Sequence, residues 1–138
     1  MEQYKVKAKH KQSGMWLFGV PLTIEGKDML LLEDTENGLR VHYVEDEMWL
    51  GEVYAVEIDK ETICRPTGLT DKNGNKIWEN DIVYIPYAHL EDTYCKVIFT
   101  FGTFIGELSD GTHDSILSRN AEVIGNIFDN PELLEVLS

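Results

Sequence analysis

Apolar and polar residues alternate along short stretches of this chain, with the period of two that is typical of half-buried β-strands. The first stretch, residues 4–11, places Tyr4, Val6, Ala8 and His10 on one side of an extended chain. Its other side carries four lysines, Lys5, Lys7, Lys9 and Lys11. Further short apolar or alternating runs follow at residues 15–24, 28–34, 40–45, 53–58, 81–87, 94–102, 103–108 and 121–128. Strands this short, at intervals of roughly ten residues, predict a β-barrel or a β-sandwich.

Two of these runs contain residues that disfavour a continuous strand. Gly19 and Pro21 interrupt the run at 15–24, which predicts a strand broken at these positions. Pro86 removes one hydrogen-bond donor from the run at 81–87, so we expect that strand either to end there or to lie at a sheet edge.

A short helix is predicted near the C-terminus. Asn130 is a suitable capping residue, Pro131 fits the first helical position, and residues 132–136 follow as ELLEV. A helix this short is unstable alone, since isolated helices need about 12–15 residues. Its leucines are therefore expected to dock on the body of the protein: Leu133, Leu134 and Leu137.

The length of 138 residues suits one domain or two very small ones. The sequence contains no internal repeat and no linker, so we interpret residues 1–138 as one domain. Within this domain, the segment 61–65 separates a β-rich N-terminal half, at about 1–61, from a C-terminal part at about 62–138.

Charge is the extreme property of the composition, because 25 acidic residues against 12 basic ones give a net charge of −13. A surface of this sign repels a phosphate backbone, so we do not expect the protein to bind nucleic acid itself. The lysines of residues 4–11 suit an edge strand that resists further pairing. The same four side chains, here named the lysine stripe, are also a candidate surface for contact with an acidic face of a neighbouring subunit.

Nothing in the sequence indicates export or membrane insertion. The apolar run at 15–24 is far shorter than the ~20 residues that span a bilayer, and no basic segment followed by an apolar one opens the chain. Cys64 and Cys95 stand far apart without metal-ligand spacing, which indicates two reduced thiols. The predicted location is therefore the cytoplasm, with no membrane contact.

The densest local signals lie in residues 65–85, RPTGLTDKNGNKIWENDIVYI. An EF-hand calcium loop that began at Asp71 would need glycine and glutamate where the chain has Lys76 and Ile82. A phosphate-binding loop would need a Lys-Ser/Thr pair before a helix, which this stretch does not contain. Asn73-Gly74 instead predicts a hairpin with a type I′ turn, because both residues tolerate positive φ. Asn80 is predicted to hold a left-handed backbone at the next corner.

Residues 67–83, TGLTDKNGNKIWENDIV, resemble a signature of the YopX family of phage and prophage proteins, and residues 122–135 resemble its closing segment. The sequence departs from the pattern at Asn75, Trp78 and Asn80, where the family usually has lysine, tyrosine or phenylalanine, and glycine. The resemblance implies a mainly β protein with a small SH3-like barrel in its C-terminal part. It supplies no catalytic residues, because the family has no established enzymatic activity. The motif positions, interpreted as structural, are Thr67, Gly68, Leu69, Asp71, Lys72, Asn73, Gly74, Ile77, Glu79, Asp81, Ile82, Val83, Gly125, Asn126, Asn130 and Pro131.

Few residues suggest chemistry. His113 lies between Asp110 and Asp114, which is compatible with a weak acid–base or metal cluster but which we interpret as a polar turn. No residue is predicted to be catalytic, and neither a cofactor nor a metal ion is expected. The aromatic residues in the predicted strands are expected to be core residues. They are Trp16, Phe18, Trp49, Trp78, Phe99, Phe101 and Phe104.

These patterns lead to one functional hypothesis and two alternatives. The leading hypothesis is a non-enzymatic, phage-encoded accessory protein in a bacterial host, which acts through a protein partner or by self-assembly into a homo-oligomer. The first alternative is an acidic mimic of DNA that occupies a host nucleic-acid-binding enzyme. The second alternative is a small hydrolase or metal-dependent enzyme built around His113.

Overall fold

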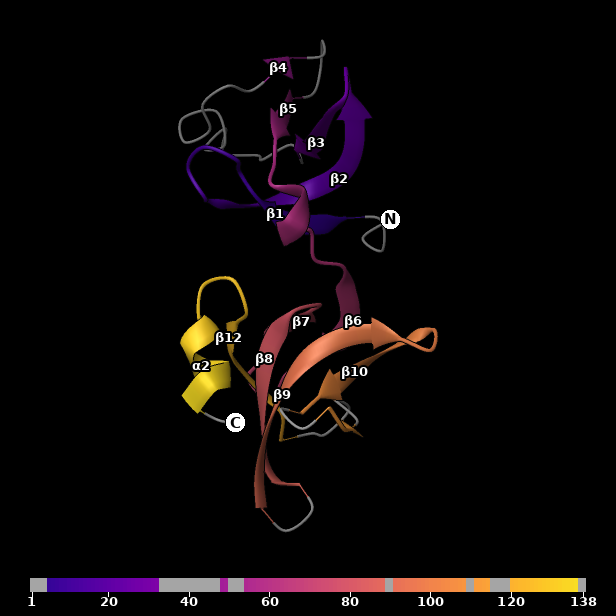
Figure 1. Ribbon diagram of the computed structural model, residues 1–138. Helices are drawn as coiled ribbons and strands as arrows, with labels where there is room; N and C mark the ends of the chain where they lie inside the picture. The colour runs from indigo at the N-terminus through magenta and orange to yellow at the C-terminus, as the bar shows by residue number, and fades with distance from the viewer. Residues whose placement is uncertain are drawn as a thin grey trace. The chain divides into compact units, whose positions relative to one another are not determined.

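The computed structural model describes residues 5–32, 48–49, 54–88, 91–108, 111–114 and 120–136, and these residues are mainly in β-strands (Figure 1). The predicted mainly β fold is confirmed. The chain divides into two compact units, Met1–Arg65 and Pro66–Ser138, which are described separately below. The predicted strand at 40–45 and the side chains of Leu134 and Leu137 lie outside the described residues.

The first unit is built on one antiparallel sheet with the strand order β1-β2-β3-β5-β4. A short 3-10 helix, η2 (Lys60–Thr62), follows the last strand. The strands are β1 (Val6–Lys9), β2 (Trp16–Ile24), β3 (Lys27–Leu32), β4 (Met48–Trp49) and β5 (Tyr54–Glu57).

Alternation in the first stretch gives β1 its two faces. Val6, Ala8 and His10 are buried, and Lys7 and Lys9 on the other face are partly exposed. The buried face contributes to the core of the first unit, because apolar side chains on β3 and β5 meet it there. This core consists of Val6, Ala8, Leu30, Leu32, Val56 and Ile58, with Leu17 and Ile63 packed against it.

β1 is the end strand of its sheet, as the lysine pattern predicts, and the chain itself covers its outer edge. Lys7 and Cys64 exchange backbone hydrogen bonds of 3.1 and 2.8 Å. The Asp59 N–H donates to the Lys9 carbonyl at 3.0 Å, and the Lys9 N–H donates to the Thr62 hydroxyl at 2.8 Å. These bonds satisfy the outward backbone groups of Lys7 and Lys9, so β1 is not open to strand addition there.

β2 runs without a break through Gly19 and Pro21, contrary to the prediction. Glycine is required at position 19 because a Cβ there would overlap the backbone carbonyl of Leu31. Proline is tolerated at position 21 because the described pairing of β2 with β1 ends at Gly19, which leaves β3 as the neighbour of this part of the strand.

The second unit contains a five-stranded antiparallel sheet, in the order β11-β10-β9-β8-β12, and a separate two-stranded sheet, β6-β7. The elements are β6 (Pro66–Thr70), β7 (Lys76–Trp78), β8 (Asp81–Ala88), β9 (Glu91–Thr100), β10 (Thr103–Glu107), β11 (His113–Asp114), β12 (Glu122–Asn126) and the helix α2 (Pro131–Val136). The core consists of Ile77, Val83, Ile85, Cys95, Val97 and Ala121, with Leu69, Phe104, Leu108 and Val123 packed against it.

β8 continues through Pro86 to Ala88. Its pairing with β9 shifts register between Ile85 and Ala88, and its described pairing with β12 ends at Tyr84. Pro86 therefore lies at a bulge with β9 as its described neighbour, where a missing N–H is tolerated.

The sheet of the second unit is open in the described residues. No pairing joins β11 to β12 there, and no closed barrel is found. The SH3-like barrel expected from the family resemblance is therefore not confirmed.

The helix α2 lies where the sequence predicts it, but Asn130 acts differently from the prediction. The Asn130 carbonyl accepts from the Leu133 N–H at 3.0 Å, while its side-chain oxygen accepts from the Asn126 N–H at 3.2 Å. Asn130 thus uses its side chain to hold the end of β12 rather than to cap the helix. Across the described ranges, no helix is long and apolar enough to cross a membrane.

Candidate interaction site

The family motif in residues 67–83 is organised around the Asp71 carboxylate, which is 6% exposed. One carboxylate oxygen accepts the backbone N–H groups of Asn73 and Asn75, both at 2.9 Å, and the other accepts from the Val123 N–H at 3.0 Å. Burial raises the pKa of Asp71, but the hydrogen bonds from Val123, Asn75 and Asn73 outweigh it and lower the pKa below its ordinary value. Asp71 therefore stays ionised and joins the β6–β7 loop to β12.

Asn73-Gly74 closes the β6–β7 hairpin as predicted, but the turn type was predicted wrongly. Asn73 keeps a negative φ, whereas Gly74 has a φ of 83°. The Gly74 N–H donates to the Asp71 carbonyl at 3.0 Å, and the Asp71 N–H donates to the Asn75 carbonyl at 2.8 Å. The result is a three-residue loop with a left-handed glycine, not a two-residue type I′ turn. The Asp71 carboxylate explains the difference, because its bonds to Asn73 and Asn75 hold the larger loop.

Other motif residues shape the same hairpin and its core. The Thr67 hydroxyl donates to the Ile77 carbonyl at 2.6 Å and accepts from the Leu69 N–H at 3.1 Å, across a register shift between β6 and β7. Gly68, between them, has a φ of 83°. The Lys72 ammonium lies 3.3 Å from the Glu122 carboxylate. Ile77, Ile82 and Val83 are core residues, each exposed by 1% or less.

The corner before β8 has the left-handed Asn80 that the sequence predicts, with a φ of 73°. The Asn80 N–H donates to the Val97 carbonyl at 2.8 Å, and the Ile127 N–H donates to the Asn80 carbonyl at 3.0 Å. The buried Asp81 carboxylate accepts from the Trp78 N–H at 2.7 Å. This corner therefore connects β8 to β9 and to the end of β12.

The C-terminal motif shapes the connection from β12 to α2. The Asn126 side-chain oxygen accepts from the N–H groups of Phe128 and Asp129, both at 2.9 Å. Gly125 leaves room for Asn130, since a Cβ on residue 125 would lie 2.6 Å from the Asn130 Oδ1 atom. In the described contacts, both motifs thus hold the fold together.

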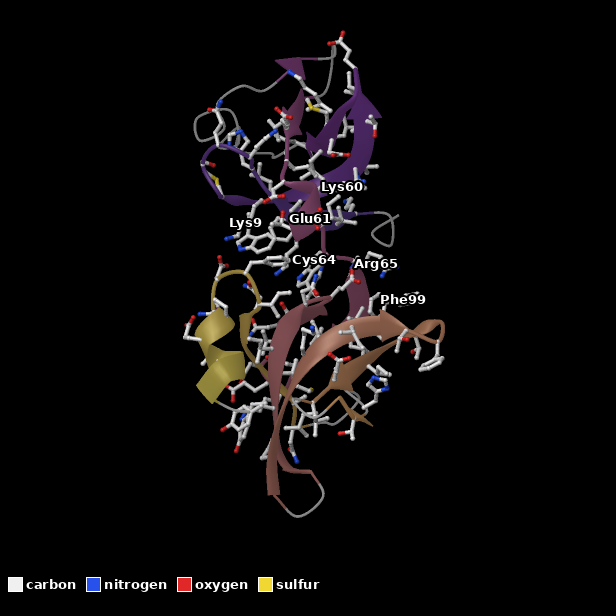
Figure 2. The ribbon with its side chains drawn as sticks, in the orientation of Figure 1. Lys9, Lys60, Glu61, Cys64, Arg65 and Phe99 are labelled. Carbon is white, nitrogen blue, oxygen red and sulfur yellow. The ribbon has the colours of Figure 1, made fainter. Side chains whose placement is uncertain are left out.

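The lysine stripe lies on the face of β1 that meets the Trp16 ring. The ammonium groups of Lys7 and Lys9 are 4.8 and 5.3 Å from the ring centre (Lys9 is labelled in Figure 2). Lys11 forms an ion pair of 3.2 Å with Glu57. These three charges therefore already have favourable contacts inside the first unit.

His113, the candidate acid–base residue, lies beside Glu107 on the surface of the second unit. Its Nε2 atom is 3.8 Å from Glu107 Oε2, and the Lys96 ammonium is 3.7 Å from Glu107 Oε1. Asp110 and the side chain of Asp114 lie outside the described residues. Among the residues that are described, no three His, Cys, Asp or Glu side chains gather in a way that could hold a metal ion.

The two cysteines and His10 are buried. Cys64 and Cys95 are each 1% exposed and form no disulfide, and the Cys64 thiol donates to the Thr62 carbonyl at 3.2 Å. His10 Nδ1 lies 2.8 Å from the Ser13 hydroxyl and accepts from the Ser13 N–H at 3.3 Å. His10 therefore stabilises the turn between β1 and β2.

The β9–β10 hairpin ends in an exposed aromatic side chain (Figure 1 shows this hairpin extending to the right). Thr100 pairs with Thr103, so Phe101 and Gly102 form a two-residue loop, with φ values of 52° and 78°. Positive φ at both positions is the type I′ conformation that the sequence predicted at Asn73-Gly74. Phe101 is 88% exposed, so the prediction that it is a core residue is wrong.

Behind this residue, a row of aromatic rings leads back to the core of the second unit. Phe99 and Phe104 face each other across β9 and β10, with ring centres 4.9 Å apart. Phe104 packs against the core, whereas Phe99 is 42% exposed. Figure 2 labels Phe99 on the second unit. We name Phe99, Phe101 and Phe104 the aromatic tip. Phe18, on β2 of the first unit, is 47% exposed and also differs from the core prediction.

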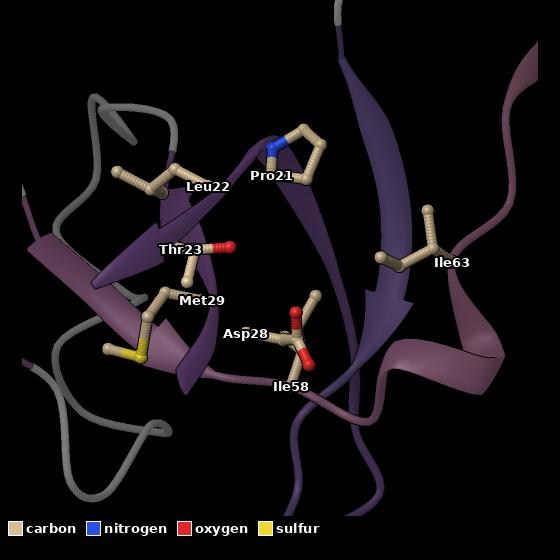
Figure 3. Close-up of a pocket in the computed structure, with 7 residues that line it drawn as sticks. All are labelled: Pro21, Leu22, Thr23, Asp28, Met29, Ile58 and Ile63. Carbon is tan, nitrogen blue, oxygen red and sulfur yellow. The ribbon is translucent and has the colours of Figure 1, made fainter. Parts of the chain in front are cut away.

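The first unit contains an open pocket of about 170 Å³ at the border of its core (Figure 3). Figure 3 shows the Asp28 carboxylate among Pro21, Ile58 and Ile63. Within the described part of the chain, the Asp28 side chain has no hydrogen bond or ion pair. Sequence reasoning missed the pocket because its residues come from separate segments of the chain. They are Pro21, Leu22, Thr23, Asp28, Met29, Ile58 and Ile63.

Together these features define a small, mainly β protein with a structural motif and an exposed aromatic tip in its second unit. The chain belongs to the YopX family, because the family model described as "YopX protein" matches residues 5–135. The resemblance seen in the sequence is thereby confirmed. The crystal structure of protein EF1440 from Enterococcus faecalis is similar, with a TM-score of 0.54 and 24% identity, over 94% of this chain and 96% of that chain. At this identity the likeness is one of fold. No curated protein matches the chain.

Proposed function

We propose that this YopX-family protein is a non-enzymatic accessory protein, encoded by a phage or prophage, that acts in the cytoplasm of a bacterial host through protein contacts. Membership of the YopX family supports the proposed phage or prophage origin. The exposure of Phe101, at 88%, carries the proposed mode of action. A non-glycine residue in the left-handed region costs about 1–3 kcal/mol. Folding recovers little of this cost by burying the ring, whereas a partner that buries it supplies about 1.5–3 kcal/mol.

Self-association is the form of protein contact that we favour. A net charge of −13 makes the charged surfaces of two copies repel each other, so an apolar contact is better suited to hold them. The lysine stripe is the alternative surface, but Lys7, Lys9 and Lys11 already interact with Trp16 and Glu57. We therefore place the contact at the aromatic tip.

The test compares the full chain with Phe101→Asn, since asparagine tolerates positive φ and removes the ring. Phe18→Asn is the matched control, because Phe18 is an exposed phenylalanine on the other unit. We expect Phe101→Asn to lose self-association in sedimentation, or a specific partner in affinity capture from host lysate, and Phe18→Asn to retain it. If wild type and Phe101→Asn have the same mass and the same bound proteins, the aromatic tip is not a contact site.

We also propose that the second unit closes as an SH3-like barrel. Its strand order places β8, β9, β10 and β11 side by side in chain order, and the last strand, β12, returns to β8. Hydrogen bonds between β11 and β12 would then remove both sheet edges. Backbone amide hydrogen exchange tests this: slow exchange in β11 supports closure, and exchange at the rate of an open edge contradicts it.

A further inference from the structure

We propose that the pocket of the first unit receives the Phe101 ring of a second copy of this chain. This inference rests on the proposed function, to which it adds the partner and the receiving site. The pocket lies at the border of the core formed by β1, β3 and β5, and the ring stands at the turn between β9 and β10.

The size of the pocket matches one phenyl ring. An apolar cavity of about 150 Å³ lined by aliphatic side chains holds a benzene molecule. The pocket measures about 170 Å³, and Pro21, Ile58 and Ile63 are among its apolar residues. The phenyl ring of Phe101 is the most exposed of the large apolar side chains in the described residues, at 88%.

The polar groups of the two surfaces are also complementary. The carboxylate of Asp28 lines the pocket and has no side-chain partner in the described part of the chain. The backbone N–H groups of Phe101 and Gly102 likewise have no hydrogen-bond partner among the residues described. When the ring enters the pocket, these two donors approach the carboxylate together with it. Charge-assisted hydrogen bonds of this kind are about twice as strong as those between neutral groups.

A contact between a tip and a pocket joins two different surfaces. Each copy then offers one phenyl ring and one pocket. Two copies can insert their phenyl rings into each other's pockets and close a two-fold dimer, or copies can add head to tail into a larger assembly. Because the phenyl ring and the pocket are different surfaces, they can be removed one at a time, in separate variants of the full chain.

Two variants separate the surfaces. Phe101→Asn removes the ring and keeps the pocket, and its melting temperature should equal or exceed that of the wild type, because asparagine suits the left-handed turn. Thr23→Trp fills the pocket from an exposed strand position and keeps the ring. Val20→Trp is the matched control, since Val20 is 39% exposed on the same strand and does not line the pocket.

Sedimentation velocity over a concentration series gives the decisive measurement. The mass of the wild type and of Val20→Trp should rise with concentration, whereas Phe101→Asn and Thr23→Trp should each remain monomeric over the same range. An equimolar mixture of these two variants should form a one-to-one dimer and nothing larger, because it retains one intact ring and one intact pocket. Asp28→Asn should weaken the association of the wild type several-fold.

The outcomes distinguish this inference from the function on which it rests. If Thr23→Trp associates like the wild type while Phe101→Asn does not, the pocket is not the receiving site, but the aromatic tip remains a contact surface. If the variant mixture stays monomeric, or if the wild type is a monomer at every concentration, this inference is wrong. If Phe101→Asn associates as strongly as the wild type, both proposals are wrong.

Discussion

At the residue scale, Asp71 shows how a buried charge can hold separate segments together. Its carboxylate accepts N–H groups from its own loop, at Asn73 and Asn75, and from β12, at Val123. Hydrogen bonds to a charged group contribute about 1.5–3 kcal/mol each to stability. In Asp71→Asn, an NH₂ group replaces one of the two carboxylate oxygens, so a backbone N–H donor then faces another donor. We therefore expect this substitution to destabilise the second unit by about 1–3 kcal/mol at pH 7.

The pH dependence of stability tests the same residue independently. The pKa of Asp71 is lowered in the folded state, so its stabilising effect is complete above its unfolded pKa of about 3.9. This contribution is lost as the pH falls through the folded pKa, because protonation then removes the charge. Between pH 7 and pH 2, the melting temperature should fall less in Asp71→Asn than in the wild type. Asp59→Asn, at an exposed carboxylate, is the control. An equal fall in melting temperature in the wild type and in Asp71→Asn would show that the charge of Asp71 does not stabilise the fold.

Gly74 gives a second prediction at this scale. Its φ is 83°, and a Cβ built on it meets no atom within 4 Å, so a substitution there is limited by backbone strain and not by space. Gly74→Val should cost about 1–3 kcal/mol in urea unfolding, because β-branched residues strongly disfavour this region. Gly74→Asn should cost less, since asparagine tolerates a left-handed backbone. Equal costs for the two substitutions would show that φ is not the cause.

At the scale of elements, the sequence predicts most strands but not the geometry of their turns. Asn73-Gly74 marks a hairpin correctly, yet the loop type depends on the Asp71 carboxylate, which no dipeptide rule includes. Phe101-Gly102 forms the type I′ turn instead, and Gly102, where the predicted run 94–102 meets the run 103–108, is the signal that could have found it. The pocket could not be predicted, because Asp28 and Ile58 meet only after the sheet has formed.

The connection between β12 and α2 allows a test of coupling between elements. Gly125→Ala places a methyl group 2.6 Å from the Asn130 Oδ1 atom and 2.8 Å from its Cγ atom, so the side chain must move and lose its bond to the Asn126 N–H. In an Asn130→Ala background those two atoms are gone. We expect Gly125→Ala to cost less there, with a coupling of about 0.5–3 kcal/mol in a double-mutant cycle. Additive effects would show that the contact does not limit residue 125.

At the scale of the whole molecule, a net charge of −13 predicts that the protein does not bind nucleic acid at physiological salt. Binding to a phosphate backbone requires several Lys or Arg contacts that release counterions. The lysine stripe is the surface that could supply them, but Lys7 and Lys9 lie against Trp16, and Lys11 pairs with Glu57. A DNA strand would have to compete with these contacts while the acidic remainder of the chain repels it.

A fluorescence titration with duplex and single-stranded DNA, at low and at physiological salt, measures this directly. Even basic proteins bind non-specifically with dissociation constants of only about 10⁻⁴–10⁻⁶ M at physiological salt, so any weak contact of the lysine stripe should vanish as salt is raised. The matched variant changes Lys5, Lys7, Lys9 and Lys11 to Glu. Micromolar or tighter binding by the wild type, lost in this variant, would make the lysine stripe the functional surface.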